Sequence, residues 1–428
     1  MRSRWNETWK KHRRAILAIG LSLGIVGLLL FIAQDPETLR VESQVAAIDP
    51  RFPDYVASLV GAPVERGDAY KVLHNGDDTY PAQLAAIDKA KSRISFETYV
   101  YKDGDIGDRF VDALARAAER GVTVRVVIDP IGSEMKGANR ERLEKAGVKV
   151  SDFNPIGFFT VEVANYRTHR KTLVIDGEVA FTGGMGVADQ WLGHAQDKEH
   201  WRDTQFQITG PAVRALEGSF YENWIETGGL SAPALDPELA PRPTGARSIV
   251  VWSNPMSGAS NIKLMYLLAI GAARKSIDIQ SPYITLDSST TWSLEQARRR
   301  GVRVRILAEG DVTDAMPVKH ASRYHYQHLL DQGIEIAEYQ PTMMHTKTFM
   351  VDGVFSIIGS ANFGNRSFEL NDELAVGVMD PDLAAELTRD FDADLKNSKR
   401  LDQATWKKQR SFDAKLNEWF WSLFGEIF

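Results

Sequence analysis

The chain has 428 residues, of which 43% are hydrophobic, and it carries a formal net charge of −6 with no cysteine. This length and composition favour two or three globular domains, and the missing cysteines exclude disulfides, thiolate metal sites and thiol nucleophiles. The first fourteen residues hold six basic side chains and one acid, so the remainder carries −11. Such an acidic remainder disfavours a general nucleic-acid binder, although a local basic groove stays open.

The N-terminus predicts a membrane anchor. Residues 15–33 form a run of 19 residues without a charge, close to the roughly 20 that a helix needs to cross a bilayer. Basic residues precede this run and acidic residues outweigh Arg40 after it, so residues 1–14 are expected to be a cytoplasmic tail and the bulk of the chain extracytoplasmic. A cleaved signal peptide is the alternative, but the run is long for one and residues 31–33 make a poor cleavage site. Residues 34–69 are interpreted as a juxtamembrane segment.

The body of the chain shows one order of elements twice. In the first half the pattern predicts a helix over residues 82–91, a strand over 94–101, an amphipathic helix up to Arg120 and a strand over 121–129. In the second half it predicts a helix over 262–273, a strand over 276–284, a helix over 292–300 and a strand over 301–308. Helices alternating with apolar strands predict an α/β fold with mixed sheets covered by helices.

A proline-rich segment separates the two halves. Residues 226–247 hold four prolines and few periodic apolar positions, which predicts a linker between two lobes, residues 70–225 and 248–398. The linker is long enough for two similar lobes to pack face to face.

A short phrase occurs once in each half: His169-Arg-Lys171-Thr-Leu-Val-Ile-Asp176-Gly177 and His345-Thr-Lys347-Thr-Phe-Met-Val-Asp352-Gly353. Alternate side chains of an extended strand share a face, so the histidine and lysine of each phrase point the same way. The Asp-Gly pair is expected to turn the chain into a partner strand. A lysine that holds a phosphoryl oxygen beside an imidazole suits phosphate chemistry. Two copies suggest one active site built from two halves.

These phrases resemble the HKD motifs of the phospholipase D superfamily. The second copy is the fuller match, because it continues through Gly359-Ser360-Ala-Asn362, Arg366-Ser367 and Asn371-Asp-Glu373. Four further stretches are similar to bacterial cardiolipin synthases: Asn165-Tyr-Arg-Thr, Trp201-Arg202-Asp203-Thr204, Gly210-Pro211-Ala-Val213 and Ser281-Pro282-Tyr283. One position departs from the family, which usually has asparagine where this chain has Gly186.

The resemblance implies two pseudo-symmetric phospholipase D-like lobes, each a mixed β-sheet flanked by helices, that meet with both motifs at their interface. It implies a phosphatidyltransferase in the inner membrane of a bacterium, acting on phosphatidylglycerol or another glycerophospholipid and an alcohol acceptor to give cardiolipin or a related lipid. Hydrolysis to phosphatidic acid is the alternative that uses the same residues. A nuclease of the superfamily and a non-catalytic lipid-binding protein are weaker alternatives. The oligomeric state stays open.

Two histidines at phosphorus suggest a two-step mechanism. One imidazole attacks the phosphodiester to form a phosphohistidine, and the other protonates the departing alkoxide and later takes the proton of the acceptor. By family analogy His169 is the nucleophile and His345 the acid and base. Lys171 and Lys347 are expected to neutralise charge on the phosphoryl oxygens. The scheme requires no metal and no cofactor.

Supporting residues follow from the same motifs. Ser360 and Asn362 are expected to donate to phosphate oxygens, whereas Asp203 and Glu373 are expected to accept from the imidazoles. The glycines 183, 184 and 359 are grouped with the substrate-binding residues. Asp176 and Asp352 complete the catalytic motif, but aspartate before glycine at a hairpin is also typical turn chemistry, which favours a structural role.

Other stretches are less specific. His320, His325 and His328 share a predicted helix, but without a clear acidic partner they do not predict a metal site. Residues 153–159 are too apolar for a solvent loop, so they either pack in the core or line an acyl-chain entrance. The C-terminal segment, residues 399–428, places aromatic residues at helical intervals, which fits an interfacial membrane helix or a helix docked on the protein's own core.

Overall fold

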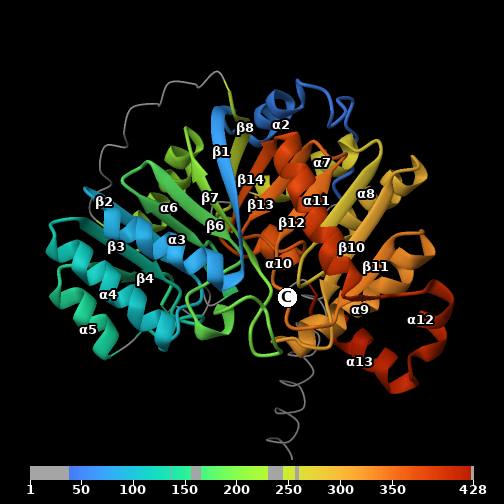
Figure 1. The fold of residues 1–428 in the computed structure, drawn as a ribbon. Coiled ribbons are helices and arrows are strands. Elements are labelled where there is room, and N and C mark those ends of the chain that lie inside the picture. The colour runs from blue at the N-terminus through green and yellow to red at the C-terminus, as the bar shows by residue number, and fades with distance from the viewer. Residues whose placement is uncertain (1–37, 136, 156–164, 230–243, 256–259, 426–428) are drawn as a thin grey trace, which may run out of the picture. The chain divides into compact units, whose positions relative to one another are not determined.

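The computed structural model describes residues 38–135, 137–155, 165–229, 244–255 and 260–425 (Figure 1). Residues 40–428 form one compact unit. The predicted anchor over residues 15–33 lies outside the described residues. Among the helices of the described ranges, none combines the length and the apolar character needed to cross a bilayer.

One sheet of 15 strands runs through the molecule. From the middle to one edge, the first half supplies β1 (Glu65–His74), β7 (Thr204–Thr209), β6 (Val179–Gly183), β5 (Thr172–Ile175), β2 (Arg93–Thr98), β3 (Thr123–Ile128) and β4 (Lys149–Asp152). From the middle to the other edge, the second half supplies β8 (Ala246–Trp252), β14 (Leu374–Met379), β13 (Phe355–Gly359), β12 (Thr348–Val351), β9 (Ser276–Gln280), β10 (Arg303–Glu309), β11 (Glu335–Tyr339) and β15 (Ser398–Arg400). Apart from β15, the two halves add their strands in the same order.

The halves join edge to edge, and the expectation of face-to-face packing is wrong. Strand β1 pairs antiparallel with β8, and Glu65 lies opposite Ser248. A buried cluster continues across this seam, with Phe206 and Leu216 from the first half and Val250 and Phe391 from the second. Because backbone pairing and a shared core hold the halves together, the proline-rich connection is not needed to position them.

Helices cover both faces of the sheet, as the alternating pattern predicts. The first half contains α3 (Asn75–Lys89), α4 (Asp105–Glu119), α5 (Ala138–Lys145) and α6 (Ala212–Glu226). The second half contains α7 (Asn261–Ala272), α8 (Ser288–Arg299), α9 (Met316–Asp331), α10 (Asn365–Glu369) and α11 (Pro381–Lys396). Every helix and strand given a range in the two halves is present, with ends shifted by up to seven residues, the largest shift being the start of α3 at Asn75 instead of residue 82. Helices α6 and α11 lie on either side of the seam (Figure 1), and both contribute to the buried cluster that continues across it.

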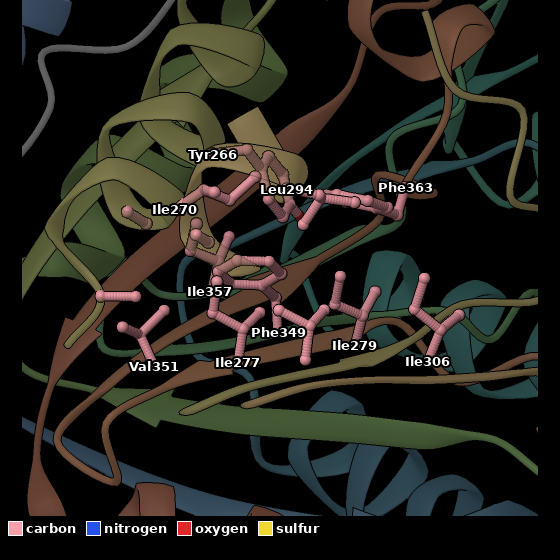
Figure 2. Packing of buried hydrophobic residues seen from close by; sticks show 14 of the residues in the cluster. Tyr266, Ile270, Ile277, Ile279, Leu294, Ile306, Phe349, Val351, Ile357 and Phe363 are labelled. Atoms are coloured by element: carbon pink, nitrogen blue, oxygen red, sulfur yellow. The ribbon is translucent and has the colours of Figure 1, made fainter. Parts of the chain in front are cut away.

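Figure 2 shows how the second half packs. Tyr266 and Ile270 of α7 and Leu294 of α8 meet Ile279 of β9 and Phe349 of β12 in one buried cluster (Figure 2). The parallel strands β9 and β10 carry the apolar runs that the sequence singles out, since strands covered by helices must be apolar.

Two terminal segments differ from their predictions. The segment interpreted as juxtamembrane contains α2 (Phe52–Val60), which inserts Phe52 into the core of the second half, with its ring 5.1 Å from that of Phe355. The C-terminal segment forms two helices, α12 (Gln403–Gln409) and α13 (Phe412–Ser422), rather than one. Phe153, at the start of the apolar stretch before the first motif, is buried, and residues 156–159 of that stretch lie outside the described residues.

The two Asp-Gly turns are built alike. Asp176 has a φ of 56° and Asp352 a φ of 54°, a left-handed conformation that aspartate tolerates better than most residues. The Asp176 carboxylate accepts hydrogen bonds from the backbone N–H groups of residues 91, 92 and 93 at 2.9, 2.7 and 3.0 Å. The Asp352 carboxylate holds residues 274–276 in the same way. Each aspartate therefore fastens the start of the neighbouring strand, β2 or β9.

This geometry predicts a purely structural effect of removing the carboxylate. Asp176→Ala leaves three backbone N–H groups without their acceptor, so the free energy of unfolding should fall by about 2 kcal/mol. Urea unfolding followed by circular dichroism measures this. Glu178→Ala, an exposed change in the same turn, serves as the control and should leave the unfolding midpoint where it is. Equal midpoints for both variants would contradict the structural role.

Candidate active site

One cavity of about 570 Å³ opens between the two halves. It is lined by His169 and Lys171 of the first motif and by His345 and Asn362 of the second. Segments 176 residues apart in the chain thus meet at one site, as the resemblance implies. Lys347 is 3% exposed and sits beside His345.

Each motif is attached to the opposite half by its backbone. The His169 N–H donates to the carbonyl of Asp372 at 2.8 Å, and the His345 N–H donates to the carbonyl of Arg202 at 2.7 Å. The histidines and lysines precede β5 and β12 rather than lying within them, which corrects their predicted placement on the strands themselves. These bonds fix the two histidines relative to each other, because each one is tied to the other's half.

The first histidine is bonded to a carboxylate of the second half. His169 Nδ1 lies 2.7 Å from Glu373 Oε1. Glu373 is fully buried, and it also accepts hydrogen bonds from the hydroxyls of Ser360 at 2.5 Å and Ser367 at 2.6 Å. An ionised carboxylate only accepts, so the Nδ1 of His169 carries the proton and its Nε2 is left with a lone pair.

The second histidine is bonded to a carboxylate of the first half. His345 Nδ1 lies 2.8 Å from Asp203 Oδ2, which also accepts from the indole N–H of Trp191 at 3.0 Å. The other oxygen of Asp203 accepts from the backbone N–H of Thr204 at 2.8 Å. The two histidine-carboxylate pairs therefore cross between the halves. The sequence identifies all four residues as partners but not which carboxylate serves which imidazole.

Buried arginines reinforce the crossing. Arg170 is fully buried and donates to the carbonyl oxygens of Ser219 in α6 and Ser253 after β8, at 2.6 and 2.7 Å. Arg202 forms an ion pair with Asp394 of α11 at 3.2 Å. Both arginines are adjacent in the chain to site residues, and sequence reasoning gave them no role, because Arg170 reaches residues of both halves and Arg202 reaches α11 of the other half.

Burial and neighbouring charge lower the pKa values of the basic groups. Burial lowers the pKa of His169 to about 4, so its imidazole is neutral at pH 7. Burial likewise lowers the pKa of Lys171 to about 7 and that of Lys347 to about 8. Although burial opposes its ionisation, His169 and Lys171 hold the pKa of Glu373 down at about 2. Burial therefore outweighs the attraction of the buried carboxylates Glu373 and Asp203 for the two lysines.

The lysines bend back onto their own motifs. Lys171 Nζ donates to the carbonyl of His169 at 2.7 Å, and Lys347 Nζ donates to the carbonyl of His345 at 2.8 Å. Lys347 Nζ also lies 3.2 Å from Nε2 of His345. The shared face that the His-x-Lys spacing predicts is therefore present in both motifs.

Several residues grouped with substrate binding do not line the cavity. Ser360 instead orients Glu373. A Cβ on Gly184 would lie 2.3 Å from the Asp203 carboxylate, and Cβ atoms on Gly183 and Gly359 would lie 2.2 Å from Gln205 Oε1 and from the carbonyl of Leu374. These glycines permit close packing beside Asp203, Gln205 and Leu374. Asp176 and Asp352 fasten strands and do not line the cavity, in agreement with the structural role that turn chemistry favours.

The two motifs differ at the position where the family usually has asparagine. Asn362 of the second half lines the cavity, and within the described residues its buried Oδ1 has no hydrogen-bond partner. Gly186 of the first half lies against Val100, two residues after β2, whose carbonyl oxygen would be 2.6 Å from an added Cβ. The amide is therefore supplied by one half only.

Aromatic rings flank the two histidines. The ring of His345 lies 5.5 Å from that of Trp191 and 5.4 Å from that of Trp201, and the ring of His169 lies 5.3 Å from that of Tyr99. All three aromatic residues line the cavity. Sequence reasoning missed Tyr99 and Trp191 as site residues. Their only signal is their place next to a predicted strand end and a motif, which many core aromatics share.

The three histidines of α9 lie elsewhere. His328 is bonded to Glu295 at 2.6 Å and His320 to Asn417 at 3.1 Å, while burial lowers the pKa of His325 to about 4. Across the described residues, no group of three or more histidine, aspartate or glutamate side chains is arranged to hold a metal ion.

Comparison with known proteins assigns the family. Residues 84–202 and 266–395 match the family model described as "Cardiolipin synthase, PLD-like domain". The chain belongs to this phospholipase D-like cardiolipin synthase family. It is 33% identical over 385 residues to cardiolipin synthase 1 of Bacillus anthracis, covering 87% of this chain and 75% of that protein. It is also 33% identical to the cardiolipin synthase of Geobacillus kaustophilus, covering 90% of this chain and 78% of that protein.

Solved structures support the fold of this family member. The phosphatidylserine synthase of Haemophilus influenzae superposes with a TM-score of 0.70 at 14% identity, covering 88% of this chain and 100% of that one. The polyphosphate kinase of Porphyromonas gingivalis gives a TM-score of 0.52 at 16% identity, covering 87% and 53%. At these identities the likeness shows the fold alone.

The crossed pairs predict a specific effect of neutralising one carboxylate. Glu373→Gln keeps the shape but no longer stabilises a proton on Nδ1 of His169, so kcat should fall by roughly 10²- to 10⁴-fold. Nitrogen NMR of labelled histidine should show His169 changing from a pure Nδ1–H form to a mixture of tautomers. Glu335→Gln, an exposed change on β11, is the control. Unchanged histidine spectra in Glu373→Gln would refute the pairing.

Proposed function

We propose that this protein is a phosphatidyltransferase that makes cardiolipin or a related phospholipid through a phosphohistidine intermediate. The observation that carries the proposal is the pair of imidazoles that open on one cavity, each bonded through Nδ1 to a buried carboxylate of the other half. Membership of the cardiolipin synthase family supports the substrate class. The proposal includes anchorage by residues 15–33 with the catalytic unit outside the inner membrane, which rests on the charge pattern of the sequence.

In the first step His169 attacks the donor lipid. Its neutral ring directs the Nε2 lone pair at phosphorus, so an N–P bond forms while the bond from phosphorus to the headgroup alkoxide breaks. His345 donates a proton to that alkoxide, which leaves as glycerol when the donor is phosphatidylglycerol. The substrate phosphate brings negative charge near His345, and this charge favours the protonated ring that the step requires.

In the second step the acceptor lipid takes the phosphatidyl group from His169, which returns the enzyme to its free form. A hydroxyl of the second lipid attacks phosphorus, His345 takes its proton, and the N–P bond to His169 breaks. Lys171, Lys347 and the amide of Asn362 are placed to bind the non-bridging oxygens as charge develops on them. Tyr99, Trp191 and Trp201 form an apolar wall beside the reacting atoms, which favours a lipid alcohol over water as the acceptor.

A lipid assay on the full-length protein in detergent tests the proposal. Phosphatidylglycerol labelled in its headgroup and its acyl chains should give cardiolipin and free glycerol, and His169→Ala and His345→Ala should each lose at least roughly 10³-fold in rate. His194→Ala, an exposed histidine, is the control and should keep the wild-type rate. Wild type denatured rapidly at mildly alkaline pH, where the acid-labile N–P bond persists, should carry a phosphatidyl group on His169, which mass spectrometry locates.

Other products would change the assignment. Phosphatidic acid as the only labelled product would make the protein a hydrolase. Activity that survives both histidine substitutions would refute the two-histidine mechanism.

The lowered lysine pKa values predict how anion binding depends on pH. An anion in the cavity favours charged lysines and raises their pKa values, so its affinity is greatest below pH 7 and falls as pH rises through the pKa values of about 7 and 8. Tungstate binding, measured by calorimetry between pH 6 and 9, should weaken by roughly tenfold per pH unit once one lysine has lost its proton.

A lysine variant separates this effect from general charge. Lys171→Met should bind tungstate more weakly at pH 6 and show a shallower dependence on pH. Lys71→Met on β1 serves as the control, because Lys71 does not line the cavity. An affinity that is constant from pH 6 to 9 in wild type would show that the lysines keep ordinary pKa values.

A further inference from the structure

Helices α9 and α13 pack together (Figure 1), and much of the exposed apolar surface belongs to them. Six of the eleven large apolar side chains that are exposed in the described residues belong to these helices. They are Met316 and Tyr324 of α9 and Phe412, Leu416, Trp419 and Phe420 of α13. We call these six residues the α9–α13 surface. Single exposed apolar residues are ordinary, but a gathered set marks an interaction surface.

Helix α13 buries a charged side chain and exposes aromatic ones, the reverse of what is usual for a helix on a water-exposed surface. Its one buried charged residue, Glu418, is 3% exposed, and it pairs with Arg410, whose guanidinium lies 4.9 Å from the centre of the Trp406 ring. Phe412 on the same helix is 78% exposed. A surface helix normally buries its apolar side and exposes its charges. This orientation leaves the aromatic side for an apolar surrounding.

The surface adjoins the mouth of the active-site cavity. Helix α9 begins at Met316, and its neighbours Ala315 and Val318 line the cavity. A lipid whose phosphate reaches His345 therefore has its acyl chains leaving the cavity next to the exposed part of α9. A continuous apolar path from the cavity to the surface would keep those chains out of water.

Charge favours a bilayer over another apolar partner. Lys407 and Lys408 of α12 and Lys415 of α13 are exposed, and Asp413 is the one exposed acid of these two helices. These two helices by themselves are therefore locally positive in a chain whose net charge is −6, while exposed Asp402 and Asp331 lie at their border. Tryptophan and phenylalanine beside lysine are typical of helices that lie in the interface of anionic membranes.

We propose that the α9–α13 surface lies in the interfacial layer of an anionic bilayer and holds the cavity mouth against the lipid that enters it. The proposal deepens the proposed function, since it rests on a lipid substrate. It adds a second, monotopic contact with the membrane, independent of any anchor at the N-terminus. Two other partners could cover this surface instead of lipid: a second copy of the chain, or the chain's own first 37 residues. The experiment must distinguish them from lipid.

The absence of cysteine makes a clean labelling experiment possible. Leu416→Cys and Leu59→Cys place one environment-sensitive fluorophore each on the full-length chain, at leucines that are 50% and 47% exposed. Leu59 lies on α2, away from the α9–α13 surface (Figure 1), and is the matched control. Both proteins are reconstituted in vesicles of phosphatidylglycerol and phosphatidylethanolamine.

The expected result is a difference between the two labels. Spin-labelled lipid should quench the probe at position 416 and shift its emission to the blue, whereas iodide in the water should quench the probe at position 59. Equal quenching of both probes by iodide would overturn the proposal. A position 416 shielded from both quenchers would also overturn it. Disulfide cross-linking through Leu416→Cys would then identify a second copy, and its absence would identify the chain's own N-terminus.

An activity measurement separates this proposal from the proposed function. Phe420→Glu should lower the ratio of turnover on bilayer phosphatidylglycerol to turnover on a short-chain, monomeric analogue by about tenfold, and Leu59→Glu should leave that ratio unchanged. An unchanged ratio in Phe420→Glu would overturn the membrane contact while the proposed function stands. Lipid quenching of the probe at position 416 in a protein that turns over neither lipid would overturn the proposed function alone.

Discussion

The site depends on two short hydrogen bonds that cross between the halves, from His169 to Glu373 and from His345 to Asp203. Hydrogen bonds of this kind weaken within a few tenths of an ångström, so the halves must be held rigidly in one relative position. The edge-to-edge pairing of β1 with β8, the core shared by α6 and α11, and the buried Arg170 all supply that rigidity. The continuous sheet is the physical condition for a shared active site.

The chemistry of the cavity follows from its burial. Removing the histidines and lysines from water makes their charged forms costly, which leaves a neutral nucleophile and lysines that regain full charge when phosphate arrives. In water the same groups would be a protonated lysine pair that binds any anion. The depressed pKa values therefore couple charge in the site to the presence of substrate, and the aromatic rings of Trp191, Trp201 and Tyr99 maintain the low polarity that this coupling needs.

Local patterns in the sequence were enough to predict four helices and four strands of the two halves and to single out the histidine and lysine of each motif, but not α2. The apolar runs at residues 121–129 and 301–308 and the Asp-Gly turns depend on neighbours in the chain, and they are confirmed. The crossing of Glu373 and Asp203 depends on how strands far apart in sequence meet, which no local pattern encodes. The same holds for Ser360 and Gly184. Their motif positions suggested contact with phosphate, whereas in three dimensions they support a carboxylate from behind.

The crossing of the histidine-carboxylate pairs also makes each half depend on the other. Each half carries a complete His-x-Lys motif and a carboxylate, yet within one half the carboxylate faces the wrong way to serve its own histidine. One half by itself therefore lacks the partner of its histidine, and the complete site needs both halves joined along β1 and β8. The halves also differ within the site, because Gly186 of the first corresponds to Asn362 of the second. The fold is repeated, but the two halves of the active site are not interchangeable.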